Sequence, residues 1–293
     1  MTQTLAHRRS AFRARLERRD AMIVPGAGNA LTARMIATHG FEAVYVSGAG
    51  LANSALGVPD LGLLTATELG TAVAAMAEVT TLPLVIDIDT GYGNALNTRR
   101  TVRMLERAGA FALQLEDQVF PKRCGHFSGK AVLPRAEAAA KVRAAVDARE
   151  DPNLLIIART DARAVEGLDA ALDRARAYLD AGADATFVEA PTDARELARI
   201  AAELPVPQVA NMVVGGATPL LPQAELAEMR FALVLYANAA LQAAMQATDD
   251  TLAALRRDGE VTAVRDRLAP FEARQRHVGK PEFDTLDARY RTE

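Results

Sequence analysis

The chain has 293 residues, half of them hydrophobic and 24% charged, so it is long enough to bury a sizeable core in one large domain. Its net charge of -3 gives no electrostatic reason to expect nucleic acid or a membrane as a partner, and no apolar run approaches the roughly 20 residues that span a bilayer. One cysteine excludes an intramolecular disulfide and a cysteine-bound metal cluster, which predicts a protein of the reducing cytoplasm.

The N-terminal segment is rich in arginine, as in a transit peptide or a nucleic-acid-binding arm. However, Phe12 and Leu16 lie one helical turn apart, and Glu17 and Asp20 interrupt the positive charge. This pattern favours a short amphipathic helix with a solvated basic face. The arginines of that face are Arg8, Arg9, Arg13, Arg15, Arg18 and Arg19.

Eight short apolar runs follow, each with a longer Ala-, Arg- and Glu-rich stretch behind it. The predicted strands are residues 21–25, 43–47, 83–87, 111–116, 154–159, 185–189, 207–211 and 231–236. Several of them are apolar throughout, as strands covered on both faces are. Clear helix patterns occupy residues 97–108, 135–148, 168–181 and 193–204, with Gly109 and Gly182 as stop signals after two of them.

Strands that alternate with helices pair in parallel through right-handed crossovers. Eight such units predict an α/β protein with a closed (β/α)8 TIM barrel, and an open doubly wound sheet is the alternative. We expect a single domain over residues 1–293, with about 240–293 as a C-terminal extension that is helical to about residue 268 and then charged. Because this extension is longer than barrel closure needs, we expect it to pack on a neighbouring subunit.

Polar groups stand at the end of seven of the predicted strands, where a parallel barrel carries its catalytic residues. One such end would mark a boundary, but seven predict a single converging site. In chain order these groups are Tyr45, Ser47, Gly48 and Ala49; Asp87 and Asp89; Glu116, Asp117 and the Cys124 loop; Arg159 and Asp161; Glu189; Asn211; and Tyr236.

Asp87 and Asp89 are two residues apart, so in an extended strand they project from the same face. With Glu116 on the next strand they form a set of hard oxygen donors suited to Mg2+ or Mn2+. The alternative for either aspartate is a turn cap before Gly91. The presence of all three acids favours the metal.

Cys124 lies in a loop with Lys122, Arg123, Gly125 and His126. A lone cysteine is commonly a small buried apolar residue, but neighbouring cations favour the thiolate and tune its pKa. Because no pattern establishes a Cys–His–Asn/Asp arrangement, we favour proton transfer over nucleophilic attack.

Arg159 is suited to clamp a carboxylate through two parallel hydrogen bonds, with Glu189 and Asn211 to orient it or to bind a second carboxylate. The alternative for Arg159 and Asp161 is a helix-start cap with a local ion pair. No phosphate-binding glycine motif is present, so no nucleotide cofactor is predicted.

At these residues the chain resembles the isocitrate lyase / phosphoenolpyruvate mutase superfamily. The matching segments are YVSGAG (45–50), GVPDLG (57–62), DIDTGYGNALN (87–97), LEDQVFPKRCGH (115–126), ARTDA (158–162), VEA (188–190), NMVVGGATPL (211–220) and the tyrosine at 236. The KRCGH loop resembles the 2-methylisocitrate lyase and dimethylmalate lyase branches, and also carboxyphosphonoenolpyruvate mutase.

The resemblance implies a (β/α)8 barrel that assembles as a homotetramer, a dimer of dimers with exchanged C-terminal helices. It implies Mg2+ on Asp87, Asp89 and Glu116, and Cys124 as the proton donor on a gating loop. Substrate contacts would come from Ser47, Gly48, Ala49, Asp87, Gly125, Arg159, Glu189 and Asn211. The catalytic set would be Cys124, Lys122, His126 and Arg159, with Tyr45 as a candidate base.

Three positions depart from the pattern of relatives: Val214 replaces a carboxylate, Asn238 lies in a changed segment after Tyr236, and Gln242 replaces an arginine. The expected activity is a Mg2+-dependent carbon–carbon lyase acting on a small 2-hydroxy di- or tricarboxylate. The departures favour a dicarboxylate of the 2-alkylmalate or oxaloacetate type over a tricarboxylate. The alternatives are a phosphonomutase, a hydrolase of oxaloacetate or phosphonopyruvate, and a catalytically silent binding protein.

Overall fold

The computed structural model describes residues 3–125, 127 and 129–291. Its sheet has eight parallel strands in the order β6-β5-β4-β3-β2-β1-β8-β7. A further parallel bridge between Thr186 and Gln208 links the two ends of this order, so the barrel is nearly closed. The predicted (β/α)8 barrel is confirmed, and the open-sheet alternative is wrong. The strands are β1 (Met22–Ala27), β2 (Val44–Val46), β3 (Leu84–Asp87), β4 (Ala112–Glu116), β5 (Leu155–Thr160), β6 (Ala185–Val188), β7 (Val209–Asn211) and β8 (Leu233–Tyr236).

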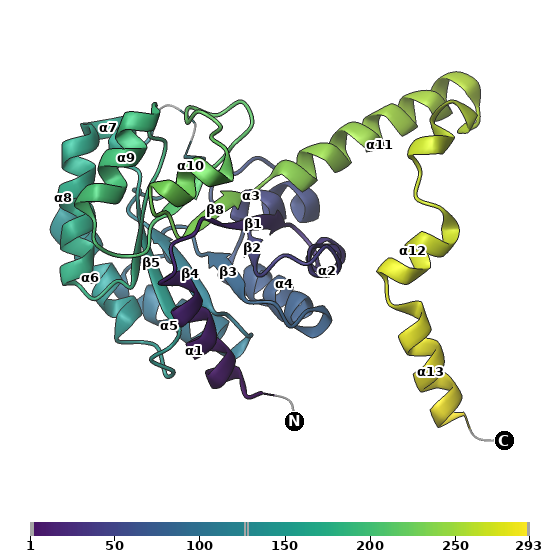
Figure 1. Ribbon diagram of the computed structural model, residues 1–293, viewed down its shortest axis with the longest axis horizontal. Coiled ribbons are helices and arrows are strands. Elements are labelled where there is room, and N and C mark those ends of the chain that lie inside the picture. Colours follow the sequence, from purple (N-terminus) through teal and green to yellow (C-terminus); the bar gives the residue numbers. More distant parts are fainter. Residues whose placement is uncertain (1–2, 126, 128, 292–293) are drawn as a thin grey trace.

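Helices surround the sheet (Figure 1). They are α2 (Ala30–Thr38), α4 (Ala66–Val79), α5 (Ala95–Arg107), α6 (Arg135–Val146), α8 (Leu168–Asp180), α9 (Ala194–Glu203) and α10 (Gln223–Glu228), with the short α3 (Gly48–Leu51), η1 (Ala52–Leu56) and α7 (Arg163–Glu166) in the connections after β2 and β5. The helix predicted over 97–108 begins earlier, because Asn94 caps it by accepting hydrogen bonds from the N–H groups of Leu96 and Asn97.

The strands are buried on both faces, which explains their continuous apolar sequences. β3, β4, β5 and β6 are buried at every position. Inward side chains such as Val24, Leu155 and Leu233 fill the barrel, and outward ones such as Val44, Leu113 and Ile156 pack under the helices. This packing holds the strand ends in place, and with them the polar groups that follow.

α1 (Leu5–Leu16) closes the lower end of the barrel, with Phe12 and Leu16 buried in the interior cluster. The predicted helix is confirmed, but its basic face is only partly solvated. Arg9 is buried and donates to the carbonyls of Ala110 and Glu106, each at 2.8 Å, with Asp151 3.2 Å away. The carbonyls and carboxylates at the end of α5 need a cation, and the sequence of α1 alone does not reveal them.

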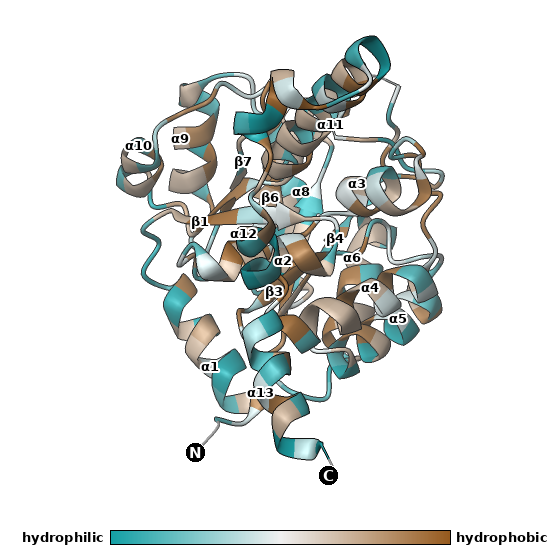
Figure 2. Cartoon of the chain, turned by 90° about the vertical axis from the view of Figure 1, so that its right-hand side faces the viewer, coloured by the Kyte–Doolittle hydropathy of each residue, from teal (hydrophilic) through white to brown (hydrophobic). Residues whose placement is uncertain are grey.

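The chain ends in an arm of α11 (Ala239–Asp258), η2 (Thr262–Arg267), α12 (Phe271–His277) and α13 (Lys280–Tyr290). α11 leads away from the barrel, and α12 and α13 return beside it (Figure 1). In the orthogonal view these two short helices lie in front of the barrel (Figure 2). The expected helix to about residue 268 is interrupted at Gly259, whose φ of 73° ends α11. None of the helices within residues 3–291 is both long and apolar enough to cross a membrane.

Candidate active site

The polar strand ends meet at one small cavity of about 60 Å3 at the carboxyl mouth of the barrel. The predicted residues that line it are Tyr45, Ser47, Ala49, Asp87, Glu116, Lys122, Cys124, Gly125, Arg159, Glu189 and Asn211. Gly48 lies against the carboxylates of Asp87 and Asp89. His126 lies outside the described residues. Tyr236 packs in the outer core cluster instead.

Asp87 and Asp89 converge, but not as neighbours in one extended strand. β3 ends at Asp87, and Asp89 has a φ of 47°, in the left-handed region. The Asp89 N–H donates to Asp87 Oδ1 at 3.1 Å, so the turn-cap interpretation is correct for Asp87. A Cβ on Gly48 would lie 3.2 Å from Asp89 Oδ1 and 3.4 Å from Asp87 Oδ2, so both carboxylates face the same glycine. The turn therefore brings the two carboxylates together, and the side chain of Asp87 also caps it.

Lys122 reaches from the Cys124 loop into this acidic cluster. Its ammonium lies 2.8 Å from Asp89 Oδ1 and pairs with Asp60. Burial disfavours the charged ammonium, but the carboxylates of Asp89 and Glu116 outweigh it and hold the pKa of Lys122 well above its ordinary value. Sequence reasoning did not single out Asp60 as a site residue. Its only signal was a carboxylate within the GVPDLG segment.

The site holds more negative than positive charge. Its carboxylates are Asp60, Asp87, Asp89, Glu116, Asp161 and Glu189, and its buried cations are Lys122, Lys130 and Arg159. Burial raises the pKa of Asp89 to about 7 and raises that of Glu116 well above its ordinary value. Both shifts favour the protonated acids, and a cation bound among them would favour the ionised carboxylates instead.

The donor set fits a hard divalent cation in its chemistry. Glu116 Oε1 is buried and accepts no hydrogen bond from the described residues, and Asp89 Oδ1 accepts no hydrogen bond from these residues but lies 2.8 Å from the Lys122 ammonium. Over residues 3–125, 127 and 129–291, no three acidic, histidine or cysteine side chains already surround one point as ligands. The ammonium of Lys122 takes part of the place that a metal would need, so this lysine would have to move aside.

Arg159 is held by three carboxylates at the end of β5. Its Nε and Nη2 bind the two oxygens of Asp161 at 2.9 and 3.1 Å, and Nη1 lies 3.1 Å from Glu189 Oε2. Glu116 Oε2 is 3.4 Å from Nε, and the guanidinium lies 5.2 Å from the centre of the Phe187 ring. The local ion pair between Arg159 and Asp161 therefore exists, but it orients a buried guanidinium toward the cavity and is no surface cap.

Tyr45 lies at the floor of the cavity, fully buried in the barrel interior. Its hydroxyl accepts a hydrogen bond from Gln114 Nε2 at 2.9 Å. Burial, followed by the charge of Asp87, raises the pKa of Tyr45 well above its ordinary value. The phenol is therefore favoured over the phenolate, which suits a hydrogen-bond donor better than a base.

The opposite wall of the cavity comes from the last two strands. Asn211 Nδ2 donates to Glu189 Oε2 at 3.3 Å, and Ser47 Oγ donates to Asn238 Oδ1 at 3.1 Å. Of the three departures from the relatives' pattern, only Asn238 lines the cavity. Val214 is 55% exposed, and Val213 takes the lining position beside it. Gln242 lies on α11 and is not part of the lining.

The Cys124 loop is tied down at its base and packs on the site. Gln118 Nε2 donates to the Arg123 carbonyl at 2.8 Å, and the Arg123 N–H donates back to Gln118 Oε1 at 2.9 Å. Gln118 also pairs with Val132 across the base of the loop. At the tip, a Cβ on Gly125 would lie 2.4 Å from Arg159 Nη2. The glycine after Cys124 is therefore required by a close approach to the arginine.

Replacing Gly125 by alanine should disturb this approach without unfolding the protein. The added methyl cannot coexist with Arg159 Nη2, so we expect the loop to lift and kcat/KM to fall about tenfold to a hundredfold. Steady-state kinetics and a thermal melt of the same preparation test this. Gly70→Ala is a suitable control for the loss of a glycine, because Gly70 lies within α4, away from the site, and an added Cβ would meet only the flexible side chain of Met104. Wild-type kinetics in Gly125→Ala would contradict the contact.

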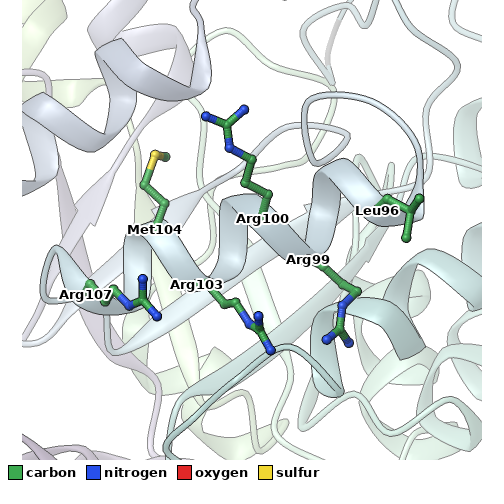
Figure 3. A pocket seen from close by; sticks show the side chains of 6 residues that line it. All are labelled: Leu96, Arg99, Arg100, Arg103, Met104 and Arg107. Carbon is green, nitrogen blue, oxygen red and sulfur yellow. The ribbon is translucent and has the colours of Figure 1, made fainter.

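A larger hollow of about 590 Å3 lies on the outer surface of α5. Figure 3 shows its lining, in which Arg99, Arg103 and Arg107 extend to one side of the helix and Arg100 and Met104 to the other. Leu96 completes the lining. It contains no carboxylate and none of the polar strand ends, so it is separate from the acidic site.

A (β/α)8 barrel whose mouth carries an acidic, arginine-containing site under a cysteine loop defines a class of enzymes that act on small anionic substrates. The model of the family described as phosphoenolpyruvate phosphomutase matches residues 12–256. The chain belongs to this family, and the resemblance read from its motifs is confirmed.

Similar proteins include lyases over almost the whole chain. 2,3-Dimethylmalate lyase of Eubacterium barkeri is 42% identical, covering 94% of this chain and 96% of its own length. 2-Methylisocitrate lyase of Salmonella typhimurium is 44% identical, covering 96% of each. Carboxyvinyl-carboxyphosphonate phosphorylmutase of Arabidopsis thaliana is 42% identical, covering 95% of this chain and 84% of its own.

Solved structures agree with this grouping. A crystal structure of 2,3-dimethylmalate lyase superposes with a TM-score of 0.91 at 34% identity, covering 99% of this chain and 96% of that one. A phosphonopyruvate hydrolase in complex with oxalate and Mg2+ superposes with a TM-score of 0.86 at 32% identity, covering 96% and 98%. The predicted grouping with the lyases is confirmed.

Proposed function

We propose that this protein is a Mg2+-dependent carbon–carbon lyase that cleaves a small 2-hydroxy di- or tricarboxylate to a 2-oxo acid and a second carboxylate. One contact carries the proposal. Gly125 lies against Arg159, so the neighbouring Cys124 lines the same cavity as the arginine and the acids Asp87 and Glu116. An anion clamp, a set of oxygen donors and a proton donor thereby face one small volume.

Bound Mg2+, or Mn2+, on Asp87, Asp89 and Glu116 would supply Lewis-acid stabilisation of negative charge on the substrate's 2-oxygen. Arg159 would hold a substrate carboxylate, since its side-chain position is already fixed by Asp161 and Glu189. The segment after β2, with Ser47, Gly48 and Ala49, would contact the part of the substrate that becomes the 2-oxo acid. The other end of the cavity would be closed by Glu189 and Asn211, whose side chains are hydrogen-bonded to each other.

In the proposed reaction the 2-hydroxyl proton leaves, the C2–C3 bond breaks, and its electron pair remains on C3 as a carboxylate-stabilised carbanion. Cys124 then transfers its thiol proton to C3. The carboxylates around Lys122 are better suited than Tyr45 to accept the hydroxyl proton, because burial favours the protonated phenol of Tyr45. Packing of the loop over the site would exclude water from the carbanion.

The lining favours a compact substrate. Ala237 and Asn238, in the changed segment after Tyr236, line the cavity together with Val213, and these residues offer small apolar surfaces and one amide. No arginine of α11 reaches the cavity to bind a third carboxylate. A dicarboxylate of the 2-alkylmalate type therefore fits this wall better than a tricarboxylate such as 2-methylisocitrate.

A substrate screen tests the proposal. Purified protein with Mg2+ would be incubated with 2-alkylmalates, 2-methylisocitrate, oxaloacetate and phosphonopyruvate. The release of a 2-oxo acid, of oxalate and of phosphate, and the formation of phosphoenolpyruvate, would each be followed separately. Release of a 2-oxo acid from an alkylmalate is the expected result. Turnover confined to the phosphonate would favour a phosphonomutase or hydrolase, turnover confined to oxaloacetate would favour a hydrolase, and turnover of none would favour a silent binding protein.

We also propose that the chain forms a homotetramer, a dimer of dimers, in the cytoplasm. The C-terminal arm supports this, because it exposes large apolar side chains along its length. They include Met245, Leu252, Phe271, Phe283 and Tyr290. Light scattering of the full chain measures the mass directly, and a monomer at micromolar concentration would contradict the proposal.

A further inference from the structure

Asp161 is shared between the arginine of the site and the loop that carries Cys124. Its side chain is fully buried. Oδ1 accepts from Arg159 Nη2 at 3.1 Å and lies 3.0 Å from Lys130 Nζ, while Oδ2 accepts from Arg159 Nε at 2.9 Å. Burial alone would raise the pKa of Asp161, but Arg159 and then Lys130 hold it below its ordinary value. One carboxylate thus joins two cations from different segments.

Lys130 connects this carboxylate to the tip of the loop. Its side chain is only 2% exposed, and its ammonium also donates to the carbonyl oxygen of Gly125. Gly125 is the residue that lies against Arg159 and Glu189, and it directly follows Cys124. Lys130 does not line the cavity, so it would act on the reaction only through the groups that it holds.

Asp161 is itself anchored from behind. Its N–H donates to Asp117 Oδ1 at 2.9 Å, and Asp117 Oδ2 accepts from Thr160 Oγ1 and from the Tyr178 hydroxyl, both at 2.7 Å. Tyr178 lies on α8, in the packed outer layer of the barrel. The connection therefore runs from α8 through Asp117 and Asp161 to Lys130, which holds Gly125 at the tip of the loop.

We propose that Lys130 is a positioning residue, which through Asp161 sets the Cys124–Gly125 segment at a fixed distance from Arg159. The thiol and the carboxylate clamp are thereby placed together, as proton transfer to a carbanion requires. The proposal rests on the proposed function for its kinetic consequence. Its structural part, the placement of Cys124 over a bound 2-oxo acid, stands independently of the substrate's identity.

The structural part is tested by alkylation of Cys124, the only cysteine in the chain. Iodoacetamide would be applied to the full-length protein with and without Mg2+ and oxalate. Oxalate with Mg2+ should protect the wild-type thiol, because the loop packs on the site. In Lys130→Met the rate of Cys124 alkylation in the presence of Mg2+ and oxalate should rise about tenfold. Lys130→Arg should restore most of the protection, because a cation again faces Asp161.

The kinetic consequence is tested by measuring kcat and KM separately. Lys130→Met should lower kcat about tenfold to a hundredfold while KM changes less than about twofold, because the lysine does not touch the substrate. Arg149→Met is the matched control. Arg149 likewise pairs with a half-buried aspartate, Asp184 at 2.7 Å, and with a backbone carbonyl, that of Leu154 at 2.9 Å, but at the entry to β5.

Wild-type protection and wild-type kcat in Lys130→Met would overturn the proposal, as would an equal loss in Arg149→Met. Thermal melts of Lys130→Met and Lys130→Arg separate misfolding of the protein from misplacement of the Cys124–Gly125 segment. If only the segment is misplaced, both variants melt at the wild-type temperature and arginine restores the protection. If no lyase substrate is found but Lys130→Met loses protection by Mg2+ and oxalate, the positioning role stands and the proposed reaction fails. If a substrate is turned over but wild type and Lys130→Met are equally protected, the proposed reaction stands and the positioning role fails.

Discussion

Cys124→Ser should lose turnover by about a hundredfold to ten-thousandfold while it keeps Mg2+-dependent binding of oxalate within about twofold of wild type. The substitution changes one atom of a half-buried side chain in the cavity lining. A serine hydroxyl gives up its proton far less readily than a thiol, so the proton transfer to the carbanion slows. Arg159 and the acids at the barrel floor are untouched, so ligand binding persists.

Single-turnover kinetics with the best substrate of the screen, and calorimetric titration with oxalate, measure the two quantities separately. Cys124→Ala is the companion variant, because it removes the proton donor altogether and should be at least as slow. Ser54→Ala is a control for loss of a hydroxyl near the mouth of the barrel, since the Ser54 hydroxyl donates to the carbonyls of Gly28 and Gly50 and does not line the cavity. Unchanged turnover in Cys124→Ser would remove the cysteine from the mechanism.

Asp87→Ala should abolish metal-dependent ligand binding, with at least about a hundredfold loss of affinity for oxalate in the presence of Mg2+. Asp87 is buried at the end of β3 and faces the same glycine as Asp89. Removing it takes away one proposed ligand and also frees the N–H of Asp89, whose turn it caps. Both effects weaken the donor set.

A thermal shift assay distinguishes loss of the metal site from loss of the fold. Wild type should gain stability from Mg2+ with oxalate, since a ligand that binds only the folded state raises the free energy of unfolding. Asp87→Ala should show no such gain, yet it should melt near the wild-type temperature in chelator, because the site carries more carboxylates than cations and loses one of them. Asp147→Ala, at the exposed end of α6, is the control. Persistent metal-dependent oxalate binding in Asp87→Ala would refute the metal assignment.

The barrel could be predicted because its determinants are local. The strands are short, largely apolar runs, as strands covered on both faces usually are. Helix ends were less predictable. α5 begins at Ala95 and not at the predicted residue 97, because the side chain of Asn94 caps it. α11 ends before Gly259, because that residue has a left-handed backbone conformation. The two ends of each strand were predictable to within two residues for the same local reason.

The acidic strand ends could also be predicted as one site, since parallel strands in a barrel deliver their carboxyl ends to the same mouth. Asp87, Glu116, Arg159 and Glu189 meet as expected. Asp60 could not be singled out, because it follows no strand, although it lines the cavity and pairs with Lys122. Among the three unusual positions, the sequence did not distinguish Asn238, which faces the cavity, from the exposed Val214.

The sequence by itself determined the (β/α)8 architecture, the family and most of the side chains that face the cavity, because these follow from local patterns and from position along each strand. Only the tertiary structure decided which charges pair. Asp161 takes both Arg159 and Lys130, Lys122 enters the acidic cluster, and Arg9 is buried against the end of α5. The physical reason is that a buried charge must find its partner wherever the fold places one, and Asp151, one partner of Arg9, lies 142 residues away along the chain.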